Sequence, residues 1–262
     1  MKRITIFAFF LIVIVSIVVV LSYRDFDTTA RTLSHPTVKP TAQVVRNESA
    51  IYPLTISGTE YAFTLTTAYP KDVLLIPNYE KKQTVSEMID LYKCSDAING
   101  GFYDTNYQPL GLVISSDPNY SHNTIPSDLF NGFFIISPNE KAVITQSESR
   151  NTKIALQSGP ILVENHEARI LRLRTDEYAR RSVIAITDDD SVLFISIFHE
   201  KNESNGPLLA EMPSLMMKIA SQMQIPLLSA LNLDGGSAST YYSEGIFLTP
   251  TTPVGSLFCV SR

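Results

Sequence analysis

The sequence predicts an α+β fold, in which a mixed, largely antiparallel sheet domain with a few helices follows an N-terminal transmembrane helix. Short runs rich in β-branched and aromatic residues recur between residues 51 and 262, and turn residues separate them. Two segments show helical spacing, and they do not alternate regularly with the strands, which argues against a doubly wound sheet. An uncharged, predominantly apolar stretch of eighteen residues, 4–21, precedes all of these elements.

This apolar stretch predicts a membrane anchor. At about 1.5 Å per residue it spans about 27 Å, close to the thickness of a bilayer core. It ends without a small-residue cleavage pattern, which favours an uncleaved anchor over a signal peptide. Lys2 and Arg3 precede it, so we expect a cytoplasmic N-terminus and an extracytoplasmic domain. The expected organisation is a membrane anchor at 1–22, a flexible tether rich in Thr, Pro, Arg and Ser at 23–50, and one domain at 51–262.

The domain begins with strand patterns. Residues 55–67 predict a hairpin or a pair of strands, and short strands are expected at 109–114, 133–136 and 142–144. Residues 154–163 form two apolar halves around Ser158-Gly159-Pro160, where the missing N–H of proline predicts a bulge or an edge. Residues 182–187 and 191–198 flank Asp188-Asp189-Asp190 and predict a hairpin. The three aspartates lack the spaced ligands and glycine of a calcium loop, so a solvated turn is favoured.

Two helices are expected. Thr84 and Glu87 have the spacing of a capping box at the start of a short helix over residues 84–92. The second helix covers residues 208–224, where one apolar stripe recurs at three- and four-residue spacing. Its members, which we expect to pack in the core, are Leu209, Met212, Met216, Ile219 and Met223.

The charge balance of the domain argues against nucleic acid as a partner. Residues 1–50 hold six basic and three acidic residues, which leaves 15 basic and 23 acidic residues in the domain, without a basic run. The two cysteines, Cys94 and Cys259, leave two alternatives open: a disulfide, which an exported location permits, or two buried thiols. Neither has metal-ligand spacing around it, and we expect no metal and no cofactor.

Two segments with paired glycines carry the clearest chemical signal. A buried strand at residues 228–233 delivers Asp234 to a sheet edge, before Gly235, Gly236 and Ser237. The second segment has the same order of residue types, with Asn99 before Gly100, Gly101 and the aromatic Tyr103. Each segment alone also fits a hairpin turn. Together they predict one site assembled from two distant parts of the chain.

Four segments in this order resemble the phosphodiester glycosidase family. They are residues 99–103 (Asn-Gly-Gly-Phe-Tyr), 158–163 (Ser-Gly-Pro-Ile-Leu-Val), 181–184 (Arg-Ser-Val-Ile) and 232–237 (Asn-Leu-Asp-Gly-Gly-Ser). The resemblance covers residues 95–250 and points to the bacterial exported branch. Two positions depart from the family pattern: Ser237 stands where a third glycine is common, and Lys218 stands where a Glu is frequent.

The resemblance implies that Asn99, Arg181 and Asp234 line the active site, and that the four glycines and Ser237 shape it. Asp234 is the expected catalytic carboxylate, since positive charge develops on the sugar ring when its C–O bond breaks. Arg181 matches phosphate oxygens, with Arg180 as the alternative. Asn99 is expected to bond a sugar hydroxyl, and the Gly235-Gly236-Ser237 amides to help hold the phosphate.

Other side chains have competing interpretations. Asp104 is a second candidate carboxylate, although a turn-capping role is favoured. Tyr103 could stack on a sugar, as could Phe102, Tyr241 and Tyr242, but aromatic residues beside strands are more often core.

The expected function is therefore hydrolysis of a sugar–phosphate diester on its glycosyl C–O side, in an envelope or extracellular glycan. Two alternatives remain. The first is a catalytically weak carbohydrate-binding protein, which Lys218 favours. The second is a phosphoesterase that cuts the phosphate–alcohol bond of the same linkage.

Overall fold

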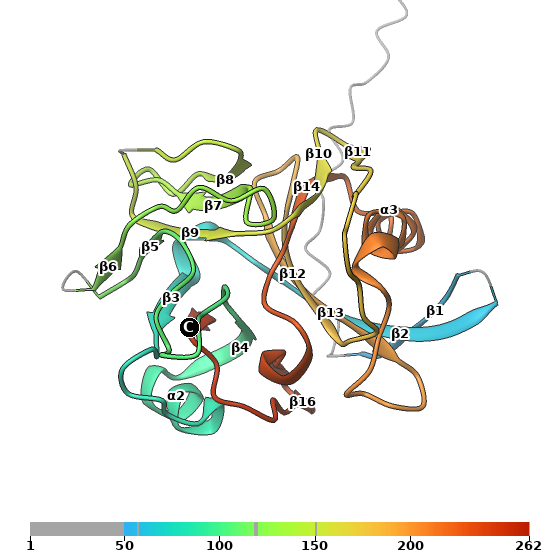
Figure 1. The fold of residues 1–262 in the computed structure, drawn as a ribbon, viewed down its shortest axis with the longest axis horizontal. Helices are drawn as coiled ribbons and strands as arrows, with labels where there is room; N and C mark the ends of the chain where they lie inside the picture. The colour runs from blue at the N-terminus through green and yellow to red at the C-terminus, as the bar shows by residue number, and fades with distance from the viewer. Residues whose placement is uncertain (1–49, 57, 118–119, 150, 262) are drawn as a thin grey trace, which may run out of the picture. The chain divides into compact units, whose positions relative to one another are not determined.

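The computed structural model describes residues 50–261, apart from residues 57, 118–119 and 150. The expected anchor and all but the last residue of the expected tether lie outside this part of the chain. Within it, no helix is both long enough and apolar enough to cross a bilayer. The described part is mostly antiparallel sheet with two α-helices, as the strand patterns predict (Figure 1).

The largest sheet has seven antiparallel strands in the order β1-β2-β13-β12-β14-β10-β11. β1 and β2 form the predicted N-terminal pair, and β12 and β13 form the hairpin around the three exposed aspartates. The strands are β1 (Tyr52–Ile56), β2 (Thr59–Ala68), β10 (Ile161–Glu164), β11 (Glu167–Ala168), β12 (Arg181–Thr187), β13 (Val192–His199) and β14 (Leu227–Asn232). β14, which leads to Asp234, lies inside the sheet between β12 and β10.

Two five-stranded antiparallel sheets complete the fold, in the orders β16-β15-β4-β17-β3 and β6-β5-β9-β7-β8. The strands of the first are β3 (Val73–Pro77), β4 (Cys94–Asn99), β15 (Tyr241–Ser243), β16 (Ile246–Leu248) and β17 (Ser256–Ser261). Those of the second are β5 (Val113–Ile114), β6 (Ser121–His122), β7 (Gly132–Ile136), β8 (Ala142–Thr145) and β9 (Ile154–Ser158). The largest hydrophobic cluster takes side chains from all three sheets, so the sheets share one core.

Two sequence patterns give elements that differ from the prediction. The strand expected over residues 109–114 is confined to β5, since Gly111 has a φ of +122° that interrupts extended backbone. Residues 154–163 split into β9 and β10, which belong to different sheets, and Gly159–Pro160 joins them through a cis peptide bond. The predicted irregularity at Pro160 is therefore the passage from one sheet to another.

The helices cover the outer faces of two sheets. α3 (Met212–Met223) packs on the seven-stranded sheet, where Met212, Met216 and Ile219 are buried as the stripe predicts. It begins later than residue 208, because residues 209–211 form a 3₁₀ turn, η2 (Leu209–Glu211). α2 (Val85–Tyr92) packs on β4 and β17, and its capping box is confirmed: the Thr84 N–H donates to Glu87 at 2.7 Å.

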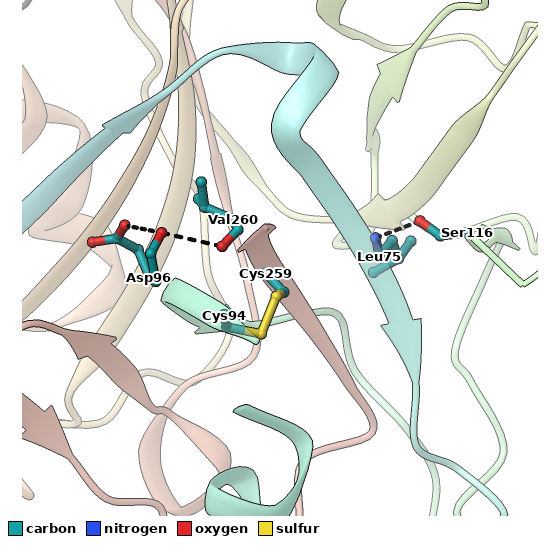
Figure 2. Close-up of a disulfide and its surroundings, with 7 residues drawn as sticks. Leu75, Cys94, Asp96, Ser116, Cys259 and Val260 are labelled. Carbon is teal, nitrogen blue, oxygen red and sulfur yellow. Dashed lines mark hydrogen bonds between the residues drawn. A yellow bond between two sulfur atoms is a disulfide. The ribbon is translucent and has the colours of Figure 1, made fainter. Parts of the chain in front are cut away.

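The two cysteines form a disulfide that resolves the alternatives left open by the sequence. Cys94 in β4 and Cys259 in β17 have Cα atoms 5.4 Å apart, and Figure 2 shows the bond joining these adjacent strands. Beside it, the Ser95 hydroxyl donates to the Val260 carbonyl at 3.2 Å. β4 continues from the disulfide to Asn99, so this cross-link anchors the strand that enters the candidate site.

Candidate functional site

The structure joins the two Gly-Gly segments at Asp234. β14 ends at Asn232, and the next two residues carry the chain to a half-buried aspartate. The Asp234 N–H donates to the Gly100 carbonyl at 3.1 Å, and Asn99 Nδ2 donates to the Asp234 carbonyl at 2.7 Å. Residues 135 positions apart in the chain therefore hold the Asp234 backbone from both sides.

Asn99 is buried, and its side-chain amide forms all of its hydrogen bonds within the protein. Besides Asp234, Nδ2 donates to the Gly100 carbonyl at 3.2 Å. The Oδ1 atom accepts from Ser182 Oγ at 2.7 Å and from the Thr240 N–H at 3.0 Å. An amide offers two donors and one carbonyl with two lone pairs, so its capacity is filled. The geometry thus gives Asn99 the part of a positioning residue, in place of the expected bond to a sugar hydroxyl.

The Asp234 carboxyl is the strongly perturbed acid of the site. Burial raises its pKa from 3.8 to about 7, and a hydrogen bond from the Gly235 N–H offsets part of that effect. Burial also raises the pKa of Tyr79 and of Tyr103, and the charge of Asp234 makes a smaller contribution to each. The carboxyl therefore lies close enough to both phenols to interact electrostatically with them, and near pH 7 it is populated in both protonation states.

The packing around Gly100 and Gly101, which follow Asn99, leaves little space for a side chain. A Cβ on Gly100 would lie 2.1 Å from Ser256 Oγ, and one on Gly101 would lie 3.2 Å from the Gln157 carbonyl. Tyr103 is half-buried, and its hydroxyl donates to the Pro253 carbonyl at 2.7 Å. Its ring stacks on Tyr107 with centroids 5.0 Å apart.

Two of the three amides expected to hold the phosphate, those of Gly235 and Gly236, are bonded within the protein. The Gly235 N–H bonds to the Asp234 carboxyl, and the Gly236 N–H donates to the Arg180 carbonyl at 2.9 Å. Neither amide is free for an anion. Ser237 is exposed, and its carbonyl accepts from the Thr251 N–H at 2.8 Å, which ties the loop to residues after β16. Gly236 has a φ of +60°, a conformation that favours glycine.

Arg181 is buried at the start of β12, and one of its nitrogens remains available. Nε donates to the Pro207 carbonyl at 2.9 Å, while Nη2 contacts Asp176 at 3.3 Å and the Glu177 carbonyl. Nη1 has no hydrogen-bond partner among the residues that the structure describes. A Cβ on Gly235 would lie 3.6 Å from this atom, so Nη1 reaches the loop that follows Asp234.

Arg180 ties three loops together. Nε and Nη2 donate to the Ser239 hydroxyl and carbonyl, Nη2 also reaches the Thr249 carbonyl at 2.7 Å, and Nη1 reaches the Glu203 carbonyl at 3.0 Å. These acceptors are neutral oxygens, which suits a framework role. Neither Arg180 nor Arg181 is among the described groups that shift the pKa of Asp234.

The other candidates of the sequence have structural roles. The Asp104 carboxylate accepts from the Asn106 and Gln108 N–H groups, each at 2.8 Å, which is the turn cap that was favoured. Tyr241 is fully buried in the core. Lys218 lies on the exposed face of α3, where its ammonium donates to the Thr55 carbonyl. Lys218 therefore bonds to a segment that contains none of the predicted site residues.

Four further polar residues support the site. Ser182 and Ser239 share a 2.8 Å hydrogen bond beside Asn99, and Tyr79 donates to Ser256 Oγ at 3.3 Å behind Gly100. Ser182 carries a usable signal, since it is a hydroxyl inside a strand whose residues are all buried. No group of three or more His, Cys, Asp or Glu side chains in the described part could hold a metal ion.

Known proteins share this fold. One is the catalytic domain of zebrafish N-acetylglucosamine-1-phosphodiester alpha-N-acetylglucosaminidase, described as auto-inhibited by its pro-peptide. It aligns with this chain at a TM-score of 0.64 and 18% sequence identity. The alignment covers 82% of this chain and 83% of that chain. A hypothetical protein from Synechocystis has a TM-score of 0.54 and 13% identity, with 80% and 62% covered. No curated protein sequence matches the chain.

The sequence itself assigns the family. The sequence model of the phosphodiester glycosidase family matches residues 92–260. This range includes Asn99, Arg181 and Asp234, together with the loops that connect them. The chain belongs to the phosphodiester glycosidase family.

Proposed function

We propose that this protein hydrolyses a glycosyl phosphodiester on the glycosyl C–O side, in an envelope or extracellular glycan, and that Asp234 is its catalytic carboxylate. The family supports action on phosphodiester-linked sugars in general. One observation carries the assignment to this residue: Asp234 is a half-buried acid with a pKa raised to about 7, at the point where the two Gly-Gly segments meet. Perturbed acids in such surroundings are typical of functional sites.

The proposed chemistry needs Asp234 in its charged form. Breaking the bond between the anomeric carbon and the phosphate oxygen leaves positive charge on the sugar ring, which a carboxylate stabilises or attacks. The departing phosphate monoester is a good leaving group, so it needs less help from a general acid than a sugar alcohol does. Because the pKa of Asp234 is raised to about 7, turnover should increase as the pH rises through this value.

The remaining residues have supporting parts in this proposal. Arg181 holds the phosphate through Nη1, with its other nitrogens fixed by Asp176 and Pro207. Asn99 holds the Asp234 backbone and is a positioning residue. Tyr103 borders the sugar. Gly100 and Gly101 permit the close packing behind it, and Gly235, Gly236 and Ser237 form the loop between Asp234 and the arginines.

We also propose that the domain faces the extracytoplasmic side, attached through residues 4–21. The Cys94–Cys259 disulfide supports this location, since disulfides persist in oxidising compartments.

The test uses the full chain with an alkyl-phosphoryl-N-acetylglucosamine and analysis of both products. Free sugar and alkyl phosphate from the wild type, with turnover reduced roughly 10²- to 10³-fold in Asp234→Asn, is the expected result. The matched control is Asp104→Asn, which removes a half-buried carboxylate from the neighbouring turn and should keep turnover. Sugar phosphate and alcohol would instead indicate the phosphoesterase. Saturable binding without turnover would indicate the carbohydrate-binding alternative.

A further inference from the structure

A small pocket of about 230 Å³ opens beside the loop that follows Asp234. Four separate segments line it: residues 177–180 before β12, Ser204 after β13, the Gly236-Ser237 pair, and Thr251 after β16. Its volume is below the roughly 300–1,000 Å³ of pockets for drug-sized ligands. The space therefore suits a single ring rather than an extended molecule.

Tyr178 exposes its ring at this pocket. Tyr178 is 63% exposed, although the residue after it, Ala179, is buried. An exposed aromatic ring on the wall of a pocket is an apolar surface that nothing in the described part of the chain covers.

The segment that carries Tyr178 is fixed in place. The Asp176 carboxylate accepts from the Leu209 and Ala210 N–H groups at 2.9 and 2.8 Å, and Arg181 donates to the Glu177 carbonyl. On the other side, Arg180 binds carbonyls of the segments that follow β13 and β16. The walls of the pocket are thus held together before any ligand binds, which lowers the entropic cost of binding.

Hydroxyl groups surround the aromatic wall. Ser204, Ser237 and Thr251 are exposed residues of the rim, and Glu177 adds a carboxylate. One apolar face with several donors and acceptors around it matches the chemistry of a sugar, which has C–H groups on its ring faces and hydroxyls around its edge.

We propose that this pocket is a binding subsite for one pyranose ring, which stacks on Tyr178 and forms hydrogen bonds with Ser204, Ser237 and Thr251. The inference rests on the proposed function in one respect, because the subsite would hold a sugar of the same glycan that Asp234 cleaves. Its own evidence is the pocket, which contains neither Asp234 nor Asn99.

Ligand-observed NMR on the full chain tests the proposal, with methyl glucoside and N-acetylglucosamine as probes and inorganic phosphate as the comparison. We expect saturable binding of at least one sugar. It should weaken about 3- to 10-fold in Tyr178→Ala and persist in Tyr178→Phe, which keeps the ring. Tyr69→Ala is the matched control, since Tyr69 is 49% exposed and lies outside the pocket. The proposal is overturned if neither sugar binds, or if Tyr178→Ala binds them as tightly as the wild type.

The same variants separate this inference from the proposed function. Asp234→Asn should bind the sugar probes normally, because its carboxyl is not part of the pocket. If the wild type shows no turnover but binds sugar in a Tyr178-dependent way, the proposed hydrolysis fails and the subsite stands. If turnover occurs and sugar binding does not depend on Tyr178, the proposed subsite is wrong and the proposed hydrolysis is supported.

Discussion

Replacing Asp234 by asparagine should stabilise the folded protein above neutral pH while it removes activity. Burial raises the pKa of this carboxyl from 3.8 to about 7, so the folded state holds its proton more tightly than the unfolded chain does. The full shift corresponds to about 4 kcal/mol of unfolding free energy, at roughly 1.4 kcal/mol per pH unit. Since Asp234 is only half-buried, solvent screening reduces the expected effect to about 1–2 kcal/mol.

The pH window follows from the direction of this shift. Below about pH 4 the carboxyl is neutral in both states and contributes no penalty. As the pH rises from 4 to 7, the unfolded chain ionises first, and the stability of the wild type falls relative to a neutral side chain. Above pH 7 both states are ionised, and the penalty remains constant. The asparagine variant carries no charge at any pH, so its advantage should appear between pH 4 and 7 and persist above.

Urea unfolding of both proteins at pH 4 and pH 8, with the disulfide intact, measures this effect. The expected result is a similar stability at pH 4 and a more stable variant at pH 8. A difference between the two proteins that is the same at both pH values would refute the reasoning, because it would show that the charge of Asp234 costs the fold nothing.

Three further changes test the surroundings of the site. Asn99→Ala should destabilise the protein by about 1–3 kcal/mol and reduce turnover, because buried partners lose their hydrogen bonds; thermal unfolding and the product assay measure both effects. Cys94→Ser with Cys259→Ser should lower the unfolding free energy by about 2–5 kcal/mol, since the bridge spans 165 positions; calorimetry against the oxidised wild type checks this. Asp176→Asn, which loosens Arg181, should raise KM more than it lowers kcat, and equal KM values would contradict the proposed phosphate contact.

Local patterns were enough to predict much of the fold. The capping box of α2, the buried stripe of α3 and the β12–β13 hairpin depend on residues close together in sequence, and all three are present. The division into three sheets depends on contacts between distant residues. Residues 154–163 show why: the two apolar halves look alike, and nothing in their periodicity reveals that they belong to different sheets.

In the candidate site, too, the sequence predicts some features and leaves others undetermined. The repeated order of polar residue and paired glycines predicted that Asn99 and Asp234 meet, and they do. What the sequence could not give is the direction of each donor. Asn99 points its amide at the protein, and the Gly236 N–H is taken by the Arg180 carbonyl, so neither group is free for the expected ligand contact. Such details depend on side-chain and backbone orientation, which residue types do not specify.

The way in which charged side chains are arranged around Asp234 supports a functional site there. Two buried arginines lie next to its loop, since the Gly236 N–H bonds to the Arg180 carbonyl and Arg181 Nη1 approaches Gly235. Yet Arg180 binds neutral oxygens, Arg181 pairs with Asp176, and neither contributes to the pKa of Asp234. A guanidinium turned toward this carboxylate would lower its pKa and remove the penalty of burial. The chain instead keeps a destabilising acid with a pKa raised to about 7, an arrangement that stability alone does not favour and that is typical of functional sites.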